Sequence, residues 1–305
     1  MKVLIETNSN IGDAVMNVPI INFLIQQYPD VSIDLVGDER SVDIFKDFQA
    51  VKNIYVKNKK SKKAKMKLFF FLRKTNYDLA IGLRSEGIPL LVRAKKKIYK
   101  FDKDKRLLNK TSETEYTFSC LKKIFPQIRF EDINQHIAIS DMTLDEIKTL
   151  IQFRENEKML VVAPGANAPG KIWLQENFIE LIHRIKQPFD KIIILGSSTE
   201  SDICSAIAEK TGGLDLSGKT TLRQIAGLCT LSRLFIGNDS GLGHIAAAQG
   251  TPTLAIFAHS DIAMGNPVRY APYRQHAIFR RSNDEAPISV DDVVNKLVSS
   301  GLLPN

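Results

Sequence analysis

Short apolar runs alternate with segments of helical periodicity along most of the chain. In the second half, the apolar runs fall at residues 160–163, 192–195, 234–236 and 253–256. Segments with helical spacing occur between and beside them, at 176–186, 200–210, 222–231 and 242–249. The first half repeats the pattern, with strands expected at 2–6, 33–36, 54–56 and 79–82. Because strands separated by helices pair in parallel, the sequence predicts an α/β protein with two Rossmann-like, doubly wound parallel-sheet domains.

A polar run at residues 154–158 separates the two series and is the expected linker. The expected domains are therefore 1–155 and 156–305, which are ordinary domain sizes. A final helix at 290–300 closes the chain, with the option that it packs back on the N-terminal domain. Two such sheets facing each other form a central cleft lined by the carboxyl ends of their strands, where ligands bind in this architecture.

The stretch 234–250 combines a strand, a polar glycine-containing loop and a helix of small residues. Amide groups at the start of such a helix, together with the helix dipole, favour a phosphate or diphosphate. Asp239, Ser240 and Gly241 lie in the loop, and His244 lies one turn into the helix. Two other interpretations stay open: a G-x-G-x-x-A dinucleotide fingerprint within the stretch, and an ordinary cap on a core helix.

Three other loops follow expected strands and carry candidate chemistry. Asp13 either caps the first helix or projects as a general base, although the helix dipole would lower its pKa. Lys171 ends a glycine- and proline-rich loop, where it either neutralises a diphosphate or is a surface lysine. Glu200 either accepts hydrogen bonds from nucleotide hydroxyls or favours a helix N-terminus.

The net charge of +8 is unevenly placed. Residues 57–67 hold seven lysines and no acid, and Phe69, Phe70 and Phe71 follow at once. This segment is either a solvated face or a basic, aromatic-edged helix that rests on an anionic membrane. Nucleic acid is not expected as a partner, because no recognised nucleic-acid module accompanies the lysines.

Other patterns exclude several classes of protein. Cys120, Cys204 and Cys229 are far apart and form no C-x-x-C pair, which indicates a reducing, cytoplasmic compartment. No cluster of histidine, cysteine and carboxylate residues has metal-ligand spacing, and the formal D-x-D at 102–104 is expected in an exposed loop. The longest strongly apolar cluster, 68–72, is too short to span a bilayer.

Five segments of the chain read IGDAVMNVP (11–19), PGANAPGKIW (164–173), LGSSTE (195–200), SGKTTLRQIAGL (217–228) and GNDSGLGHIAAAQGTPTLAIF (237–257). Together they resemble glycosyltransferase family 9, the ADP-heptose:lipopolysaccharide heptosyltransferases, which have a GT-B fold. The last is close to the family pattern D-[ST]-G-x-x-H-x-A-A-x-x-x-x-P and is quite specific. The resemblance covers most of the chain in layout.

The resemblance implies an inverting, metal-independent glycosyltransferase without a cofactor. It moves heptose, or a related sugar, from an ADP-sugar to a lipopolysaccharide-core acceptor. The implied catalytic residues are Asp13, as base for the acceptor hydroxyl, and Lys171, beside the diphosphate. Glu200 is expected at the ribose and Thr220 near the nucleotide base. The full implied donor site is Ala166, Asn167, Lys171, Glu200, Thr220, Asp239, Ser240, Gly241 and His244.

The resemblance also implies a cytoplasmic enzyme, peripheral at the inner membrane of a Gram-negative bacterium. The expected contacts with an anionic acceptor or membrane are Lys59, Lys60, Lys62 and Lys63. Alternative functions are a non-catalytic nucleotide- or glycan-binding relative, a dinucleotide-dependent oxidoreductase and a sugar-nucleotide epimerase of the same fold.

Overall fold

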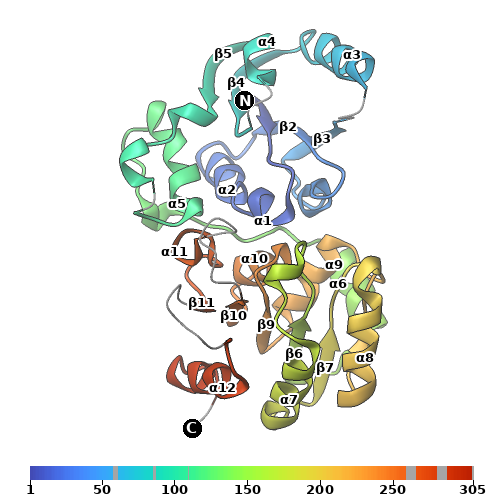
Figure 1. The fold of residues 1–305 in the computed structure, drawn as a ribbon. Coiled ribbons are helices and arrows are strands. Elements are labelled where there is room, and N and C mark those ends of the chain that lie inside the picture. The colour runs from blue at the N-terminus through green and yellow to red at the C-terminus, as the bar shows by residue number, and fades with distance from the viewer. Residues whose placement is uncertain (58–60, 85–86, 109, 259–265, 280–286, 304–305) are drawn as a thin grey trace. The chain divides into compact units, whose positions relative to one another are not determined.

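The computed structural model describes residues 1–57, 61–84, 87–108, 110–258, 266–279 and 287–303. The chain divides into two compact units, Met1–Ile139 and Ser140–Asn305. Each unit is built on one parallel sheet, with β1 to β5 in the first unit and β6 to β11 in the second (Figure 1). The predicted fold of two Rossmann-like parallel-sheet domains is confirmed.

The first sheet has the strand order β3-β2-β1-β4-β5, and every pairing in it is parallel. Its strands are β1 Lys2–Glu6, β2 Ser32–Gly37, β3 Val51–Val56, β4 Asn76–Gly82 and β5 Arg93–Tyr99. Val3, Leu4 and Ile5 are fully buried, as expected of a central strand that is covered on both faces. The strand order reverses between β1 and β4, which is where ligands bind in sheets of this kind.

The helices of the first unit are α1 Ile11–Val15, α2 Val18–Gln27, α3 Lys62–Leu72, α4 Ile88–Leu91 and α5 Glu113–Phe118. Its 3-10 turns are η1 Val42–Phe45, η2 Lys100–Asp102, η3 Lys105–Leu107, η4 Ser119–Lys123 and η5 Phe130–Asp132. The sequence predicts one helix beginning at Asp13, whereas the structure has two. The second helix carries Pro19 in its first turn, where proline is tolerated because it has no N–H to donate.

The second sheet has the order β11-β10-β9-β6-β7-β8 and is again entirely parallel. Its strands are β6 Met159–Ala163, β7 Lys191–Ile194, β8 Leu214–Asp215, β9 Leu234–Asn238, β10 Thr253–Phe257 and β11 His276–Phe279. If β6 is counted as the first strand of this sheet, the strand order is the same as in the first sheet, with β11 as one additional edge strand. Its reversal lies between β6 and β9.

The helices of the second unit are α6 Asp141–Leu150, α7 Gln175–Ile185, α8 Ser201–Thr211, α9 Leu222–Thr230, α10 Gly241–Ala248, α11 Pro267–Tyr270 and α12 Val290–Ser299. Its 3-10 turns are η6 Pro169–Lys171 and η7 Ser198–Glu200. The last helix packs in the core of this unit, where Val293 and Leu297 are fully buried together with Phe178 of α7. The last helix is therefore part of the core of the second unit.

The division between the units falls before α6, whereas the sequence analysis expects it after that helix, at 155–156. In the structure α6 packs against α9 of the second unit, and two side-chain hydrogen bonds join the two helices. Gln224 Nε2 donates to Glu146 Oε2 at 2.9 Å, and Arg223 Nη1 donates to Thr143 Oγ1 at 3.4 Å. The polar run 154–158 is thus a connection inside the second unit, between α6 and β6.

The sequence pattern does not predict β5, β8 and β11. All three are edge strands, which bury fewer side chains than central ones and therefore carry a weaker apolar signal. β5, for example, reads RAKKKIY, and only Ile98 in it is buried. Lysines on an edge strand also discourage pairing with other chains.

Candidate functional site

The carboxyl ends of β6 and β9 lie at the reversal of the second sheet. Ala163 pairs with Gly237 there, and a Cβ added at Gly237 would lie 2.8 Å from the Ala163 carbonyl oxygen. Any side chain at this position would therefore force the two strands to shift. The absence of a side chain lets the loops after β6 and β9 leave the sheet next to each other.

Asn238, the last residue of β9, fixes these two loops. It is fully buried, accepts a hydrogen bond from Trp173 N at 3.1 Å and donates one to Pro164 O at 2.6 Å. The Trp173 indole N–H is satisfied by Ile288 O at 2.7 Å. Because these buried polar groups are paired, the loop from Pro164 to Trp173 has a defined conformation. The sequence analysis gives Asn238 no role, since its partners come from distant segments.

Lys171 and Asp239 form an ion pair across these loops. Their side chains are only 16% and 10% exposed, so solvent screens the pair weakly. The carboxylate cannot itself attract a phosphate, but it holds the lysine Nζ at the reversal of the sheet. Two predicted donor-site residues are thus brought together in an arrangement that can present one cation to a diphosphate.

Ser240 lies at the N-cap position of α10, and its side chain makes no capping hydrogen bond. Its Oγ is buried and has no hydrogen-bond partner among the residues that the structure describes. The interpretation of Ser240 as an ordinary helix cap is therefore wrong. With Gly241 as the first residue of α10, the loop offers a hydroxyl and the helix's unpaired amides to a ligand oxygen.

His244 lies in the first turns of α10 and is buried. Burial lowers the pKa of its imidazole to about 4, although the carboxylate of Asp239 opposes this shift. At neutral pH the ring is therefore uncharged. It can still donate one N–H to a ligand, but not as a cation.

Glu200 closes the turn after β7. Its Oε2 accepts hydrogen bonds from the backbone N and the Oγ of Ser197, both at 2.7 Å, and so caps η7. Its other oxygen lies against Gly165, where an added Cβ would come within 1.9 Å of Oε1. Glu200 therefore caps this turn, and its contact with nucleotide hydroxyls stays a prediction. Its carboxylate also adjoins the loop that leads to Lys171.

The remaining predicted donor residues lie around this centre. Ala166 is half-buried and Asn167 exposed, between Gly165 and η6. Thr220 is half-buried and directly precedes Thr221, whose Oγ1 accepts from Gln224 N at 3.3 Å to cap α9.

In the first unit, Asp13 lies in the first turn of α1, after β1. Asn10 occupies the N-cap position, and its Nδ2 donates to Asp13 Oδ2 at 3.1 Å, so the interpretation of Asp13 as the cap is wrong. Burial raises the pKa of Asp13, and the negative charge of Glu113 adds to the rise. The hydrogen bond from Asn10 and the cations Lys103 and Arg84 oppose it. The net shift is upward, so burial outweighs the groups that lower the pKa. A raised pKa favours a carboxylate that can act as a base.

Lys103 is a residue that the sequence analysis places in an exposed loop, but the structure buries it. Its Nζ donates to Glu113 Oε1 at 3.0 Å and to Thr117 Oγ1 at 2.8 Å, and it lies 4.9 Å from the Tyr116 ring centroid. The neighbouring carboxylates of the D-x-D pattern have protein partners. Asp102 pairs with Lys123, and Asp104 pairs with Arg106.

The lysine-rich segment is not uniform. Lys57 is buried, and its Nζ pairs with Glu6 Oε1 at 3.1 Å at the carboxyl end of β1. Lys59 and Lys60 lie outside the described residues. Lys62 begins α3, and the side chain of Lys63 is exposed.

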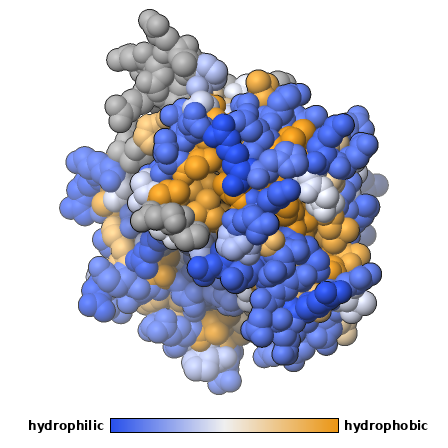
Figure 2. Space-filling view, turned by 90° about the horizontal axis from the view of Figure 1, so that it is seen from below, coloured by the Kyte–Doolittle hydropathy of each residue, from blue (hydrophilic) through white to orange (hydrophobic). Residues whose placement is uncertain are grey.

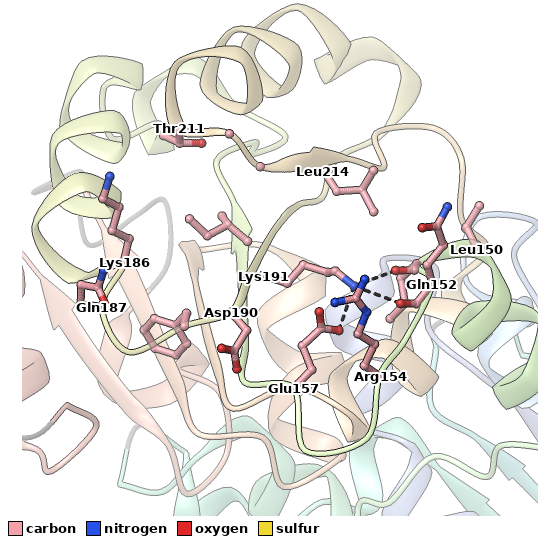
Figure 3. A pocket seen from close by; sticks show the side chains of 15 residues that line it. Leu150, Gln152, Arg154, Glu157, Lys186, Gln187, Asp190, Lys191, Thr211 and Leu214 are labelled. Carbon is pink, nitrogen blue, oxygen red and sulfur yellow. Dashed lines mark hydrogen bonds and ion pairs between the residues drawn. The ribbon is translucent and has the colours of Figure 1, made fainter.

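A pocket of about 780 Å³ lies at the opposite end of the second sheet from Lys171 (Figure 3). It is lined by residues near the amino ends of β6, β7 and β8, among them Glu157, Asp190 and Leu214. In its wall Lys191 Nζ donates to Ile151 O at 2.9 Å and pairs with Glu157 Oε2 at 2.8 Å. Ligands bind at the carboxyl ends of such sheets, so this pocket is not the candidate donor site.

The described residues hold no candidate metal site and no candidate membrane span. They contain no group of three or more histidine, cysteine or acidic residues able to hold a metal ion. No helix among them has the length and apolar character needed to cross a membrane. The face drawn in Figure 2 is mainly hydrophilic, with hydrophobic residues in patches between hydrophilic ones. Cys120, Cys204 and Cys229 are free and buried.

Two parallel sheets of this strand order, one in each unit, define an α/β protein of the GT-B class. The model of glycosyltransferase family 9 (heptosyltransferase) matches residues 66–293, and the chain belongs to this family. It is therefore a glycosyltransferase. Membership of this family favours sugar transfer over the alternative of a dinucleotide-dependent oxidoreductase.

Similar proteins extend over most of the chain. Lipopolysaccharide heptosyltransferase 3 of Escherichia coli K12 is 26% identical over 284 residues, covering 84% of this chain and 82% of the relative. Lipooligosaccharide heptosyltransferase 2 of Campylobacter jejuni is 26% identical and covers 88% of this chain and 84% of the relative.

Solved structures establish the fold independently. The family 9 glycosyltransferase of Veillonella parvula superposes with a TM-score of 0.81 at 18% identity, over 100% of this chain and 97% of that one. The Escherichia coli heptosyltransferase WaaC with ADP gives a TM-score of 0.75 at 18% identity, over 98% and 99%.

Proposed function

We propose that this glycosyltransferase transfers heptose from ADP-heptose to a lipopolysaccharide-core acceptor, with inversion at the anomeric carbon and without an obligatory metal ion. The heptosyltransferases to which the chain is similar support the donor and the acceptor. The observation that carries the proposal is the shielded Lys171–Asp239 pair beside the Ser240 hydroxyl at the start of α10, which has no hydrogen-bond partner in the part of the chain that the structure describes.

On the donor side, the second unit binds the nucleotide sugar. Lys171, the Ser240 hydroxyl and the first amides of α10 contact the diphosphate, while Asp239 keeps Lys171 in place. Neutral His244 donates an N–H to the same group. Glu200 receives the ribose hydroxyls and Thr220 lies near the base. Gly241, Ala166 and Asn167 line the same loops.

On the acceptor side, Asp13 takes the proton of the attacking hydroxyl. The acceptor oxygen forms a bond to the anomeric carbon while the carbon–oxygen bond to the diphosphate breaks on the opposite face. The electron pair of that bond leaves with ADP. Donors fixed before the reaction stabilise the charge that develops on the leaving group, so the protein supplies the stabilisation that a metal ion would otherwise give.

The test is Asp13→Asn in the full chain, assayed by ADP release with ADP-heptose and a lipopolysaccharide-core acceptor. Loss of a general base is expected to slow transfer on the order of 10²–10⁴-fold. The affinity for ADP should stay close to that of the unmodified protein. Asp30→Asn, at an exposed aspartate of the same unit, is the matched control. An Asp13→Asn protein with normal turnover would refute the assignment.

Stereochemistry and metal dependence need separate measurements. NMR of the product is expected to show an anomeric configuration opposite to that of the donor. Transfer is expected to continue at an unchanged rate in excess EDTA. A retained configuration or a chelator-sensitive rate contradicts the corresponding part of the proposal.

The proposal includes peripheral contact with the cytoplasmic face of the inner membrane of a Gram-negative bacterium. The lysines 59, 60, 62 and 63 are the expected contacts for anionic acceptor groups or lipid. This location is supported by the charge of the segment and by the lipopolysaccharide substrates named for the relatives. Cell fractionation in high and low salt would test it, because electrostatic attachment is released by salt.

A further inference from the structure

Helices α3 and α4 cover the same face of the first sheet. Leu68 and Leu72 of α3 pack in one apolar cluster with Ile88 of α4 and with Val92, which ends that helix. The cluster also contains Leu4 of β1, Val36 of β2 and Ala80 of β4. The two helices, although about 20 residues apart in sequence, therefore lie over one layer of the sheet (Figure 1).

Large apolar side chains point away from this cluster on both helices. Met66 and Phe70, one helical turn apart on α3, are 52% and 56% exposed. Leu90 and Leu91 on α4 are 60% and 51% exposed. We call these four residues the docking face. Single exposed apolar residues are ordinary, whereas several on two helices that share one apolar cluster are a candidate interaction surface.

Cations surround the docking face. Lys63 and Lys67 follow the same helical spacing as Met66 and Phe70, and residues 61–77 contain no acid. Lys97 Nζ donates to Leu90 O at 3.2 Å and to Val92 O at 2.9 Å, which places a further cation at the end of α4. Lysines in the first turn of α3 oppose the helix dipole, so they do not serve the stability of the helix itself.

We propose that the docking face seats on an anionic lipid bilayer, with its four apolar side chains entering the boundary between headgroups and acyl chains. This inference rests on the proposed membrane contact and names the residues that make it. Lysines around the face contact lipid phosphates while their stems lie along the apolar layer. A second copy of the chain is a poorer occupant, because the two faces would bring like charges together.

The test measures sedimentation of the full-length protein with vesicles at physiological salt. Phosphatidylethanolamine–phosphatidylglycerol vesicles are compared with phosphatidylcholine vesicles. Binding is expected only to the anionic vesicles. The pairs Met66→Gln with Phe70→Gln, and Leu90→Gln with Leu91→Gln, are each expected to weaken partitioning roughly tenfold or more. Met142→Gln, at a side chain 72% exposed on α6 of the other unit, should leave it unchanged.

Controls separate this inference from the proposed function. Thermal unfolding checks that the glutamine variants are folded, and transfer to a delipidated, soluble acceptor should be unaffected by them. The proposed docking face is refuted if both double glutamine variants bind vesicles as well as the unmodified protein does. It is also refuted if Met142→Gln weakens vesicle binding equally. Both conclusions hold even if transfer is normal. A dimer of the unmodified protein that the glutamine pairs convert to a monomer also overturns it, in favour of contact between copies. Failure of transfer with intact vesicle binding refutes only the reaction.

Discussion

At the scale of single residues, burial shifts the pKa values of two residues of the proposed site, Asp13 and His244. Asp13 and His244 come from different units, yet both are held toward their neutral forms because each loses hydration. For Asp13 this increases its proton affinity and improves it as a base. For His244 it removes a cation that would otherwise compete with Lys171 as the positive group of the site.

Asp13→Asn is expected to raise the melting temperature at pH 7.5. The pKa of Asp13 is raised in the folded protein, so stability is lost as the pH rises through the window between its ordinary value and the raised one. At pH 7.5 the folded protein must carry a charge that burial disfavours, and asparagine removes that charge. Calorimetry of the variant and of Asp30→Asn checks this. A lower melting temperature for Asp13→Asn alone would contradict it.

His244 is expected to make the protein sensitive to acid. Its pKa is lowered from 6.5 to about 4. Between these values the unfolded chain binds a proton that the folded chain does not, so stability falls as the pH drops through this window. The loss is on the order of 3 kcal/mol at pH 4. Urea unfolding at pH 7 and pH 5 should show a smaller difference for His244→Gln than for the unmodified protein.

Lys103→Met is expected to move the acid limb of the kcat/KM profile to higher pH. The cation of Lys103 lowers the pKa of Asp13, and its removal also leaves the charge of Glu113 unopposed, which acts in the same direction. A shift of up to about one pH unit is expected. The exposed Lys105→Met is the control. A profile that moves to lower pH, or not at all, contradicts the electrostatic role.

The buried lysines show what the sequence does not reveal at this scale. Lys57 stands in a run of lysines that looks solvated, and Lys103 stands between two acids. Their burial depends on Glu6 and Glu113, whose positions are set by the folded sheet and by α5. The loop residues Lys171, Asp239 and Ser240 are easier to identify, because they follow strands and carry local phosphate-site chemistry.

At the scale of elements, the connection between the loops after β6 and β9 depends on Asn238. Asn238→Ala would leave Trp173 N and Pro164 O without their partner, and a buried unsatisfied group costs about 1–3 kcal/mol. Denaturant unfolding is expected to show a loss of this size together with weaker ADP binding. Asn295→Ala, on the exposed side of α12, should be neutral or slightly stabilising. Equal effects from the two variants would rule out the loop-fixing role.

Hydrophobic patterning predicts the central strands well because they are buried on both faces. It misses the edge strands β5, β8 and β11, which carry fewer buried side chains, although it predicts the edge strand β3. It also cannot assign α6 to a unit, since an amphipathic helix shows an apolar face without showing which sheet that face covers. The pairing of Gln224 with Glu146 is a tertiary fact that no local pattern contains.

At the scale of the whole molecule, each compact unit has its own sheet and its own apolar core. Calorimetry is therefore expected to resolve two unfolding transitions, since separate cores need not unfold together. ADP should raise only the transition of the second unit, by an amount that grows with its concentration. A single transition that ADP shifts as a whole would instead show that the two cores unfold cooperatively.

Because α12 stays with the second unit, the chain passes between the units once, near residues 139 and 140. A crossover in the gene at that point would transplant either half intact, with no returning segment to disrupt. Recombination between ancestral genes could then have joined one donor-binding unit to first units that accept different acceptors. Chimaeras joined there offer a direct way to retrace that history.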